Sequence, residues 1–411
     1  MNLQARIAIE ALRAGVPNRE AVRLLATEQT AIEQGFELAL HRAWADGARH
    51  GSGLGIAGGF GTGKSHLLGY LEEVALAQNF VVSPVVVSKE TPLSDPARLF
   101  QAALRGAVLP GRNDDPMTAA LAELRRSPAD LAKLQAVVAG PDSGFAPVFA
   151  ALLFLLGRPA TPAERVRRFE KFLAGNRLNQ SDLRQALKEA GAARMFDVRA
   201  VPAAQLAVQR ARFTPLLFRL AGFAGWCLLL DEVELIGRYT PLQRAGAYAE
   251  LARWLGLDAS VRIPGLVSVY AITEDFRTAV IENRGDADKL PERLRLKGRP
   301  EQAALASAGI RHISTAPRRL LPPGDADLLA CHDRLRELYT SAYDWPAPPA
   351  PTAVRTATDT LRQFIKGWVT YWDVLRLEGT AASIVAGTLA MIYAESGELS
   401  EPPEPDDEPE R

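Results

Sequence analysis

Gly58-Gly59-Phe60-Gly61-Thr62-Gly63-Lys64-Ser65 decides the fold of this chain, because it fits the pattern G-x-x-x-x-G-K-[ST] at every fixed position. The short apolar Leu54-Gly55-Ile56-Ala57 precedes it, as a buried strand would, and residues 66–78 then carry leucines at helical spacing. Strand, glycine-rich loop and helix therefore follow one another in the order that a nucleotide-phosphate site requires. A glycine-rich turn that matches by chance is the alternative interpretation.

The residue types of this loop suit a triphosphate. Glycines allow positive φ and close approach to an anion, so that backbone N–H groups and the helix N-terminus point at the phosphates. Lys64 is expected to reach the β and γ phosphates, and the Ser65 hydroxyl to take one position on a magnesium ion. The predicted cofactors are thus ATP and Mg²⁺. The predicted nucleotide-binding residues are Gly58, Gly59, Phe60, Gly61, Thr62, Gly63, Lys64, Ser65 and His66.

The composition is that of an ordinary globular protein, with 47% hydrophobic and 23% charged residues in 411. A chain of this length exceeds what one core usually organises, so two domains are expected. Lys+Arg and Asp+Glu both number 48, which leaves no global attraction to nucleic acid or to a membrane.

Cys227 and Cys331 lack metal-ligand spacing. No signal peptide or membrane-spanning run is recognisable, which predicts a cytoplasmic protein with reduced thiols.

The pattern along the chain divides it into four parts. Residues 1–50 have the periodicity of helices. Residues 51–320 hold the phosphate-loop core, interrupted at about 104–218 by a predicted helical insertion with almost no strand signal. Residues 321–395 return to helix and are expected to form a C-terminal domain. Residues 396–411 are rich in Pro, Glu and Asp, which predicts a disordered acidic tail.

Further strands are expected to complete a parallel sheet. Residues 80–87 are strand-like but contain Pro84, which cannot donate to a ladder and so indicates an edge strand or a bulge. Residues 226–230 and 266–272 are apolar runs that stop abruptly at polar residues, as strands do when their C-terminal ends carry the chemistry. A weaker strand is expected at residues 310–314.

An acidic pair, Asp231-Glu232, ends the strand at residues 226–230. A carboxylate is needed to anchor the magnesium shell, and a second one can orient and deprotonate the attacking water. Asp231 is assigned the metal and Glu232 the water, which favours hydrolysis, because simple kinases commonly lack this second acid. Two acids that merely end a strand are the alternative. Glu234 is expected to lie on the other side of the chain as a structural residue.

Thr273 ends the next strand, where its hydroxyl is a candidate for contact with the attacking water or the γ-phosphate. Glu274 competes for that place, and an ordinary strand-ending threonine is the alternative.

Four arginines are candidates for a catalytic contact. Arg293, Arg295 and Arg299 form a basic cluster that is available to the nucleotide of an adjacent subunit, because a guanidinium spreads its charge over phosphate oxygens. Which of them acts is left open, and a solvated loop is the alternative. Arg362 is the candidate for reaching the γ-phosphate from the C-terminal domain.

Five segments carry a family resemblance in combination. They are Leu12-Arg13-Ala14-Gly15-Val16-Pro17, Gly61-Thr62-Gly63-Lys64-Ser65-His66, Ser88-Lys89-Glu90-Thr91-Pro92-Leu93, Asp231-Glu232-Val233-Glu234 and Phe364-Ile365-Lys366-Gly367-Trp368. Together they resemble the P-loop ATP-binding proteins of bacterial anti-phage defence islands, notably the BREX ATP-binding protein BrxD and its relatives. These are similar to AAA+ ATPases of the origin-recognition and helicase-loader branch.

The resemblance implies an α/β fold of the AAA+-like P-loop NTPase type with a five-stranded parallel sheet. The sensor strand would separate the Walker B strand from the phosphate-loop (Walker A) strand, and the strand of Pro84 would lie at the edge. A large helical insertion and a C-terminal helical lid complete the implied fold, and Arg362 matches the sensor-2 position loosely. Family members act with helicases, methyltransferases or nucleases, which implies such partners and leaves contact with DNA and homo-oligomerisation open.

The preferred interpretation is an ATPase that hydrolyses Mg-ATP to drive conformational change or assembly in a BREX-like defence complex, acting on or with DNA. The alternative is a nucleotide-gated scaffold that binds ATP, hydrolyses little of it and recruits defence partners. A small-molecule P-loop kinase is disfavoured by Asp231-Glu232 and by the lack of an arginine-rich acceptor lid.

Overall fold

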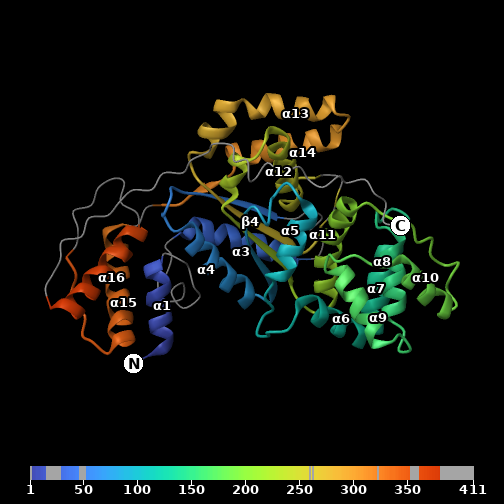
Figure 1. Cartoon of the computed structure of the whole chain (residues 1–411), viewed down its shortest axis with the longest axis horizontal. Helices are drawn as coiled ribbons and strands as arrows, with labels where there is room; N and C mark the ends of the chain where they lie inside the picture. Colours follow the sequence, from blue (N-terminus) through green and yellow to red (C-terminus); the bar gives the residue numbers. More distant parts are fainter. Residues whose placement is uncertain are drawn as a thin grey trace.

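A parallel β-sheet forms the centre of the molecule in the computed structural model (Figure 1). The structure describes residues 2–14, 29–45, 52–258, 261, 263–321, 324–351 and 361–379. Within these residues the sheet has five strands in the order β2-β3-β4-β1-β5, and every pairing is parallel. The strands are β1 (Ser52–Ala57), β2 (Phe80–Val86), β3 (Gly225–Asp231), β4 (Leu266–Ile272) and β5 (Arg318–Arg319).

This order confirms the implied topology, since β4 separates β3 from the phosphate-loop strand β1 and β2 lies at the edge. The edge position accommodates Pro84. Val82 exchanges both of its backbone hydrogen bonds with Val108, which lies outside the sheet edge. Because N–H groups two residues apart on a strand point to the same side, the nitrogen of Pro84 also faces outward, and the ladder with β3 loses no donor.

Helices cover both faces of the sheet (Figure 1). One face packs against α3 and α4, and the other against a larger set that includes α5, α11 and α12. The helices up to β3 are α1 (Leu3–Ala14), α3 (Thr30–Trp44), α4 (Lys64–Ala77), α5 (Pro96–Arg105), α6 (Pro116–Arg126), α7 (Pro128–Ala139), α8 (Pro147–Leu156), α9 (Ala163–Leu173), α10 (Gln180–Glu189) and α11 (Ala203–Leu220). Those after β3 are η1 (Val233–Arg238), α12 (Pro241–Trp254), η2 (Arg277–Glu282), α13 (Asp286–Leu296), α14 (Pro300–Thr315), α15 (Asp325–Tyr343) and α16 (Leu361–Glu378).

Strand β3 shows why the sheet is buried on both sides. Cys227 and Leu229 belong to the core under α3 and α4, whereas Trp226, Leu228 and Leu230 belong to the core on the opposite face. All five side chains are almost fully buried. Alternate residues of a strand point to opposite faces, so a continuous apolar run is what a doubly covered parallel strand requires.

The stretch between residues 104 and 218 is entirely described, and it contains the helices α6 to α11 and no strand of the sheet. These helices share one apolar core with the face of the sheet that lies opposite α3 and α4. Phe218 of α11 packs edge-on against Trp226 of β3, and Phe213 of the same helix packs against Phe149 of α8. The helical stretch is therefore fixed to the sheet through α11.

A separate apolar core joins the two ends of the described chain (Figure 1). Helix α1 packs against α15 and α16, and the three helices enclose Ile9, Leu335, Tyr339 and Trp372. The first helix of the chain is thus part of the same helical unit as the C-terminal helices.

The strand predicted at residues 310–314 is wrong, because this segment belongs to α14. The alanine-rich sequence before it favours helix, and Gly309 lets α14 lie directly on α12. A Cβ at Gly309 would lie 2.1 Å from the carbonyl oxygen of Tyr248. The fifth strand is instead the two-residue β5.

The predicted tail at 396–411 lies outside the residues that the structure describes. Among the described residues, no helix is long and apolar enough to cross a bilayer.

Candidate functional site

The glycine-rich loop joins the C-terminal end of β1 to the first turn of α4. Gly61 and Gly63 have positive φ, 78° and 104°, which side chains other than glycine rarely adopt. A Cβ at Gly58 would lie 2.7 Å from the Thr62 hydroxyl, so the loop has no room for a side chain there. Helix α4 begins at Lys64 and Gly63 provides no side-chain cap. The first-turn amides of a helix have no acceptor within the helix, and a bound anion is one acceptor that suits them.

Lys64 lies within this loop, with its side chain 8% exposed. Its Nζ donates to the carbonyl oxygens of Gly58 and Gly59, each at 3.0 Å. Thr62 Oγ1 donates to the same Gly59 carbonyl at 2.9 Å. The loop is thus held in shape by its own lysine and threonine.

The C-terminal ends of β1, β3 and β4 lie side by side where the glycine-rich loop begins. Ala57 of β1 is paired with Ile272 of β4, and the Gly58 N–H donates to the Ile272 carbonyl at 3.2 Å. Leu230 of β3 is paired with Tyr270 of β4, so Asp231 ends one residue beyond that pair. Since neighbouring strands lie about 4.8 Å apart, Asp231 faces the loop across a single intervening strand. This spacing suits a carboxylate that reaches a loop-bound phosphate through a metal ion.

The chain changes direction directly after Asp231. Glu232 has φ 57° and ψ 35°, a left-handed conformation, and its side chain is exposed. Its N–H donates to Asp231 Oδ1 at 2.8 Å, which fixes the orientation of that carboxylate. The following residues form the 3₁₀ helix η1.

Glu234 lies on the phosphate-loop side, so its predicted position on the other side of the chain is wrong. Its Oε1 lies 3.9 Å from Lys64 Nζ, and its side chain is 2% exposed. Its Oε2 is buried and has no hydrogen-bond partner among the described residues. Burial raises the pKa of Glu234 to about 7, against the opposing effect of the Lys64 ammonium. The left-handed backbone at Glu232 produces this placement, because it turns the chain from β3 into η1.

Thr273 and Glu274 follow β4 beside the loop. Thr273 is 4% exposed, and Glu274 is exposed with its Oε1 3.9 Å from the point where a Cβ of Gly59 would lie. The structure therefore places the competing carboxylate of Glu274 against the loop as well.

The comparisons with known proteins agree with the resemblance seen in the sequence. Residues 2–109 match the family model of the BREX system ATP-binding protein BrxC/D. The matched segment runs from α1 through the phosphate loop and α5. No curated protein and no solved structure matched the chain.

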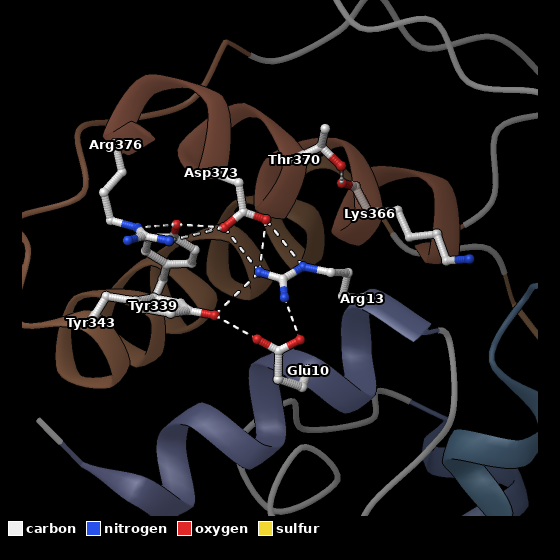
Figure 2. Close-up of polar contacts among 8 residues, drawn as sticks. All are labelled: Glu10, Arg13, Tyr339, Tyr343, Lys366, Thr370, Asp373 and Arg376. Atoms are coloured by element: carbon white, nitrogen blue, oxygen red, sulfur yellow. Dashed lines mark hydrogen bonds and ion pairs between the residues drawn. The ribbon is translucent and has the colours of Figure 1, made fainter. Parts of the chain in front are cut away.

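The BrxC/D-matched segment begins with α1, whose Arg13 joins it to the C-terminal helices (Figure 2). Arg13 donates through Nη2 to both carboxylate oxygens of Asp373 in α16, at 2.9 and 2.7 Å, and through Nε to Oδ2 at 3.1 Å. Tyr339 of α15 donates its hydroxyl to Asp373 Oδ1 at 2.8 Å, and Arg376 Nε donates to that hydroxyl at 3.0 Å. Arg13 also pairs with Glu10. This residue of the Leu12–Pro17 motif therefore has a structural role; residues 15–17 lie outside the described ones.

The predicted arginines lie on or next to α13, α14 and α16. Arg293 and Arg295 are exposed on α13, which packs on α12, α14 and η2, and Arg295 pairs with Glu292 at 3.1 Å. Arg299 precedes α14 and is exposed. Arg362 lies in α16, but its side chain is outside the described ones. Among the described contacts none joins these arginines to the loop, and their predicted roles remain predictions.

The described residues contain no cluster of three or more His, Cys, Asp or Glu side chains that would enclose a metal. Ser65 lies in the first turn of α4 and Asp231 ends β3, and both have the oxygen atoms that magnesium takes as ligands beside water and phosphate oxygens.

Proposed function

We propose that this chain is an AAA+-like ATPase that binds Mg-ATP at Gly58–His66 and Asp231 and acts in a bacterial BREX-type defence complex. The observation that carries the proposal is the alignment of the Lys64 loop with the ends of β3 and β4 at one edge of a 2-3-4-1-5 sheet. The family model that matches residues 2–109 is described as an ATP-binding protein, which supports the choice of nucleotide.

Each group of the site has a chemical task in this proposal. The loop amides and Lys64 hold the phosphates, while Ser65 and Asp231 would hold Mg²⁺, which when bound would neutralise charge on the phosphate oxygens. Glu232 takes a proton from the attacking water, whose oxygen bonds to the γ-phosphorus as the bond to the β–γ bridging oxygen breaks. Thr273 or Glu274 orients this water.

The test is ATP binding and phosphate release by the full chain. Lys64→Ala should weaken ATP binding by roughly 30-fold to 150-fold, since charge-assisted hydrogen bonds to the phosphates contribute about 2–3 kcal/mol. Glu232→Gln should bind ATP as the wild type does and release phosphate at least 100-fold more slowly, the scale of general-base catalysis. Equal phosphate release by wild type and Glu232→Gln would remove Glu232 from this role.

A nucleotide-gated scaffold is the second candidate, because Glu232, the proposed base, is exposed to solvent and has a left-handed backbone conformation. In that case the wild type binds ATP but releases phosphate no faster than Glu232→Gln, even with duplex DNA and partner proteins present. In either case ATP would change how the helical unit of α1, α15 and α16 sits against the core or against partners.

We also propose a division of the chain into domains at residues 1–50, 51–320 with the insertion at 104–218, and 321–395. Helix α1 is assigned to the domain at 321–395.

A further inference from the structure

Glu234 is a buried acid whose position in the site is not explained by the tasks assigned above. It follows β3 on η1, with its side chain 2% exposed and its Oε2 without a hydrogen-bond partner among the described residues. A buried carboxylate normally accepts hydrogen bonds that compensate its loss of water. Besides its own backbone N–H, the group that faces the Glu234 carboxylate is Lys64 Nζ at 3.9 Å, which is too long for a hydrogen bond.

Lys64 is engaged by the loop itself. An ammonium group has three N–H donors, and two of them are given to the Gly58 and Gly59 carbonyls. The carboxylate of Glu234 attracts the Lys64 ammonium from the side of η1. The same donors are needed by the β and γ phosphates of a bound nucleotide. Phosphate binding and this arrangement therefore make competing demands on one side chain.

Glu234 acts on Lys64 through its charge, without a hydrogen bond. Lys64 on α4 is the cation that faces it, and Asp231 and Glu232 add negative charge from the end of β3. An incoming triphosphate adds more negative charge at the same place. Two opposite charges about 4 Å apart attract strongly where water is excluded, and like charges repel to a similar degree.

We infer that Glu234 is a positioning residue that competes with the triphosphate for Lys64, holds the ammonium against the loop between nucleotides, and thereby weakens ATP binding. This inference rests on the proposed function. It assigns Glu234 to the release of nucleotide rather than to the chemical step, since the residue acts through Lys64 and touches no reacting atom.

The experiment measures the dissociation constant of Mg²⁺ and a fluorescent ATP analogue for the full chain at pH 8, above the pKa of about 7 of the Glu234 carboxyl. Glu234→Gln, which removes the charge and keeps the shape, should bind between about threefold and tenfold more tightly than the wild type, mainly through slower dissociation. Glu234→Asp, which keeps the charge, should stay within about twofold of the wild type. A residue that only supports the fold would show the opposite order, because the shorter aspartate leaves a gap.

Glu250→Gln is the matched control, because Glu250 is also buried but contacts Arg253 and Trp254 on α12. Its ATP affinity should equal that of the wild type. Equal or weaker binding by Glu234→Gln, or a lower urea midpoint than wild type, overturns the inference. These outcomes leave the proposed function intact if Lys64→Ala loses ATP. A wild-type protein that ignores ATP overturns both.

Discussion

Two buried ion pairs in the phosphate-loop core differ in how well they are satisfied. Arg244 of α12 and Asp286 of α13 are 4% and 1% exposed, and two hydrogen bonds of 2.9 Å join the guanidinium to both carboxylate oxygens. Tyr248 donates its hydroxyl to the same carboxylate at 3.0 Å. Lys64 and Glu234 are similarly buried, but they lie 3.9 Å apart and one carboxylate oxygen has no partner among the described residues.

The difference separates a fixed contact from an exchangeable one. A buried pair with every polar atom engaged holds two helices in one arrangement, and its loss leaves an uncompensated charge. A buried pair with poor geometry gives up little when a better partner arrives. The satisfied pair lies where α12 meets α13, away from the loop, and the unsatisfied one lies where a phosphate would bind. At the loop, the incompletely satisfied pair therefore coincides with the place proposed for the phosphates.

Breaking the satisfied pair should have the largest effect. Asp286→Ala leaves the Arg244 guanidinium buried without its counter-charge, so the free energy of unfolding should fall by about 3–5 kcal/mol. Urea denaturation of the full chain measures this. Glu292→Ala is the control on the same helix, because its exposed pair with Arg295 should contribute less than about 1 kcal/mol. Equal losses from the two changes would contradict the contrast drawn here.

Removing the charge of Glu234 from the unsatisfied pair should raise the free energy of unfolding instead of lowering it, and this gain should depend on pH. Burial raises the pKa of the Glu234 carboxyl to about 7 from its ordinary value of 4.5. The folded state then holds this proton over a range where the unfolded state has lost it, so stability falls as pH rises from about 4.5 to 7. Glu234→Gln lacks this loss. Its unfolding free energy should match wild type at pH 4 and exceed it at pH 8, by on the order of 3 kcal/mol. An unchanged difference at both pH values would refute the assignment.

The half-exposed cluster between α1, α15 and α16 should give the smallest effect (Figure 2). Arg13 and Asp373 are 36% and 19% exposed, so solvent screens much of their attraction. Arg13→Lys keeps the charge but loses the two-point contact, and we expect a loss of roughly 0.5–1 kcal/mol. Faster hydrogen–deuterium exchange in α1, with unchanged ATP affinity, is the expected readout. Unaltered exchange in α1 would show that the apolar contacts alone hold it.

Much of the phosphate-loop core follows from local sequence. The loop, the strands at 226–230 and 266–272, and the edge position of Pro84 each depend on residue types that have few other uses: glycines with positive φ, doubly buried apolar runs, and a residue without an N–H. The acidic pair was recognisable because it ends a buried run. In each case the chemical requirement is read within a few residues.

Features that depend on chain direction or on distant contacts were not predicted. The left-handed backbone at Glu232 turns the chain into η1 and directs Glu234 to Lys64, and a non-glycine residue gives no sequence signal for that conformation. Strand β5 has only two residues, both exposed arginines, and so has no apolar pattern. Residues 310–314 looked like a strand because a short apolar run does not by itself separate helix from strand.

The packing of α1 on α15 and α16 has a practical consequence for shortened versions of the protein. A version that starts at the phosphate-loop strand, as a motif-based trimming would suggest, removes Ile9 and Leu12 from the face of Leu335 and Tyr339. That face would then be open to water, and an open apolar face promotes self-association. The fragment also lacks α3, which packs on the sheet, so poor solubility or loss of activity would reflect both missing N-terminal helices and would say little about the nucleotide site.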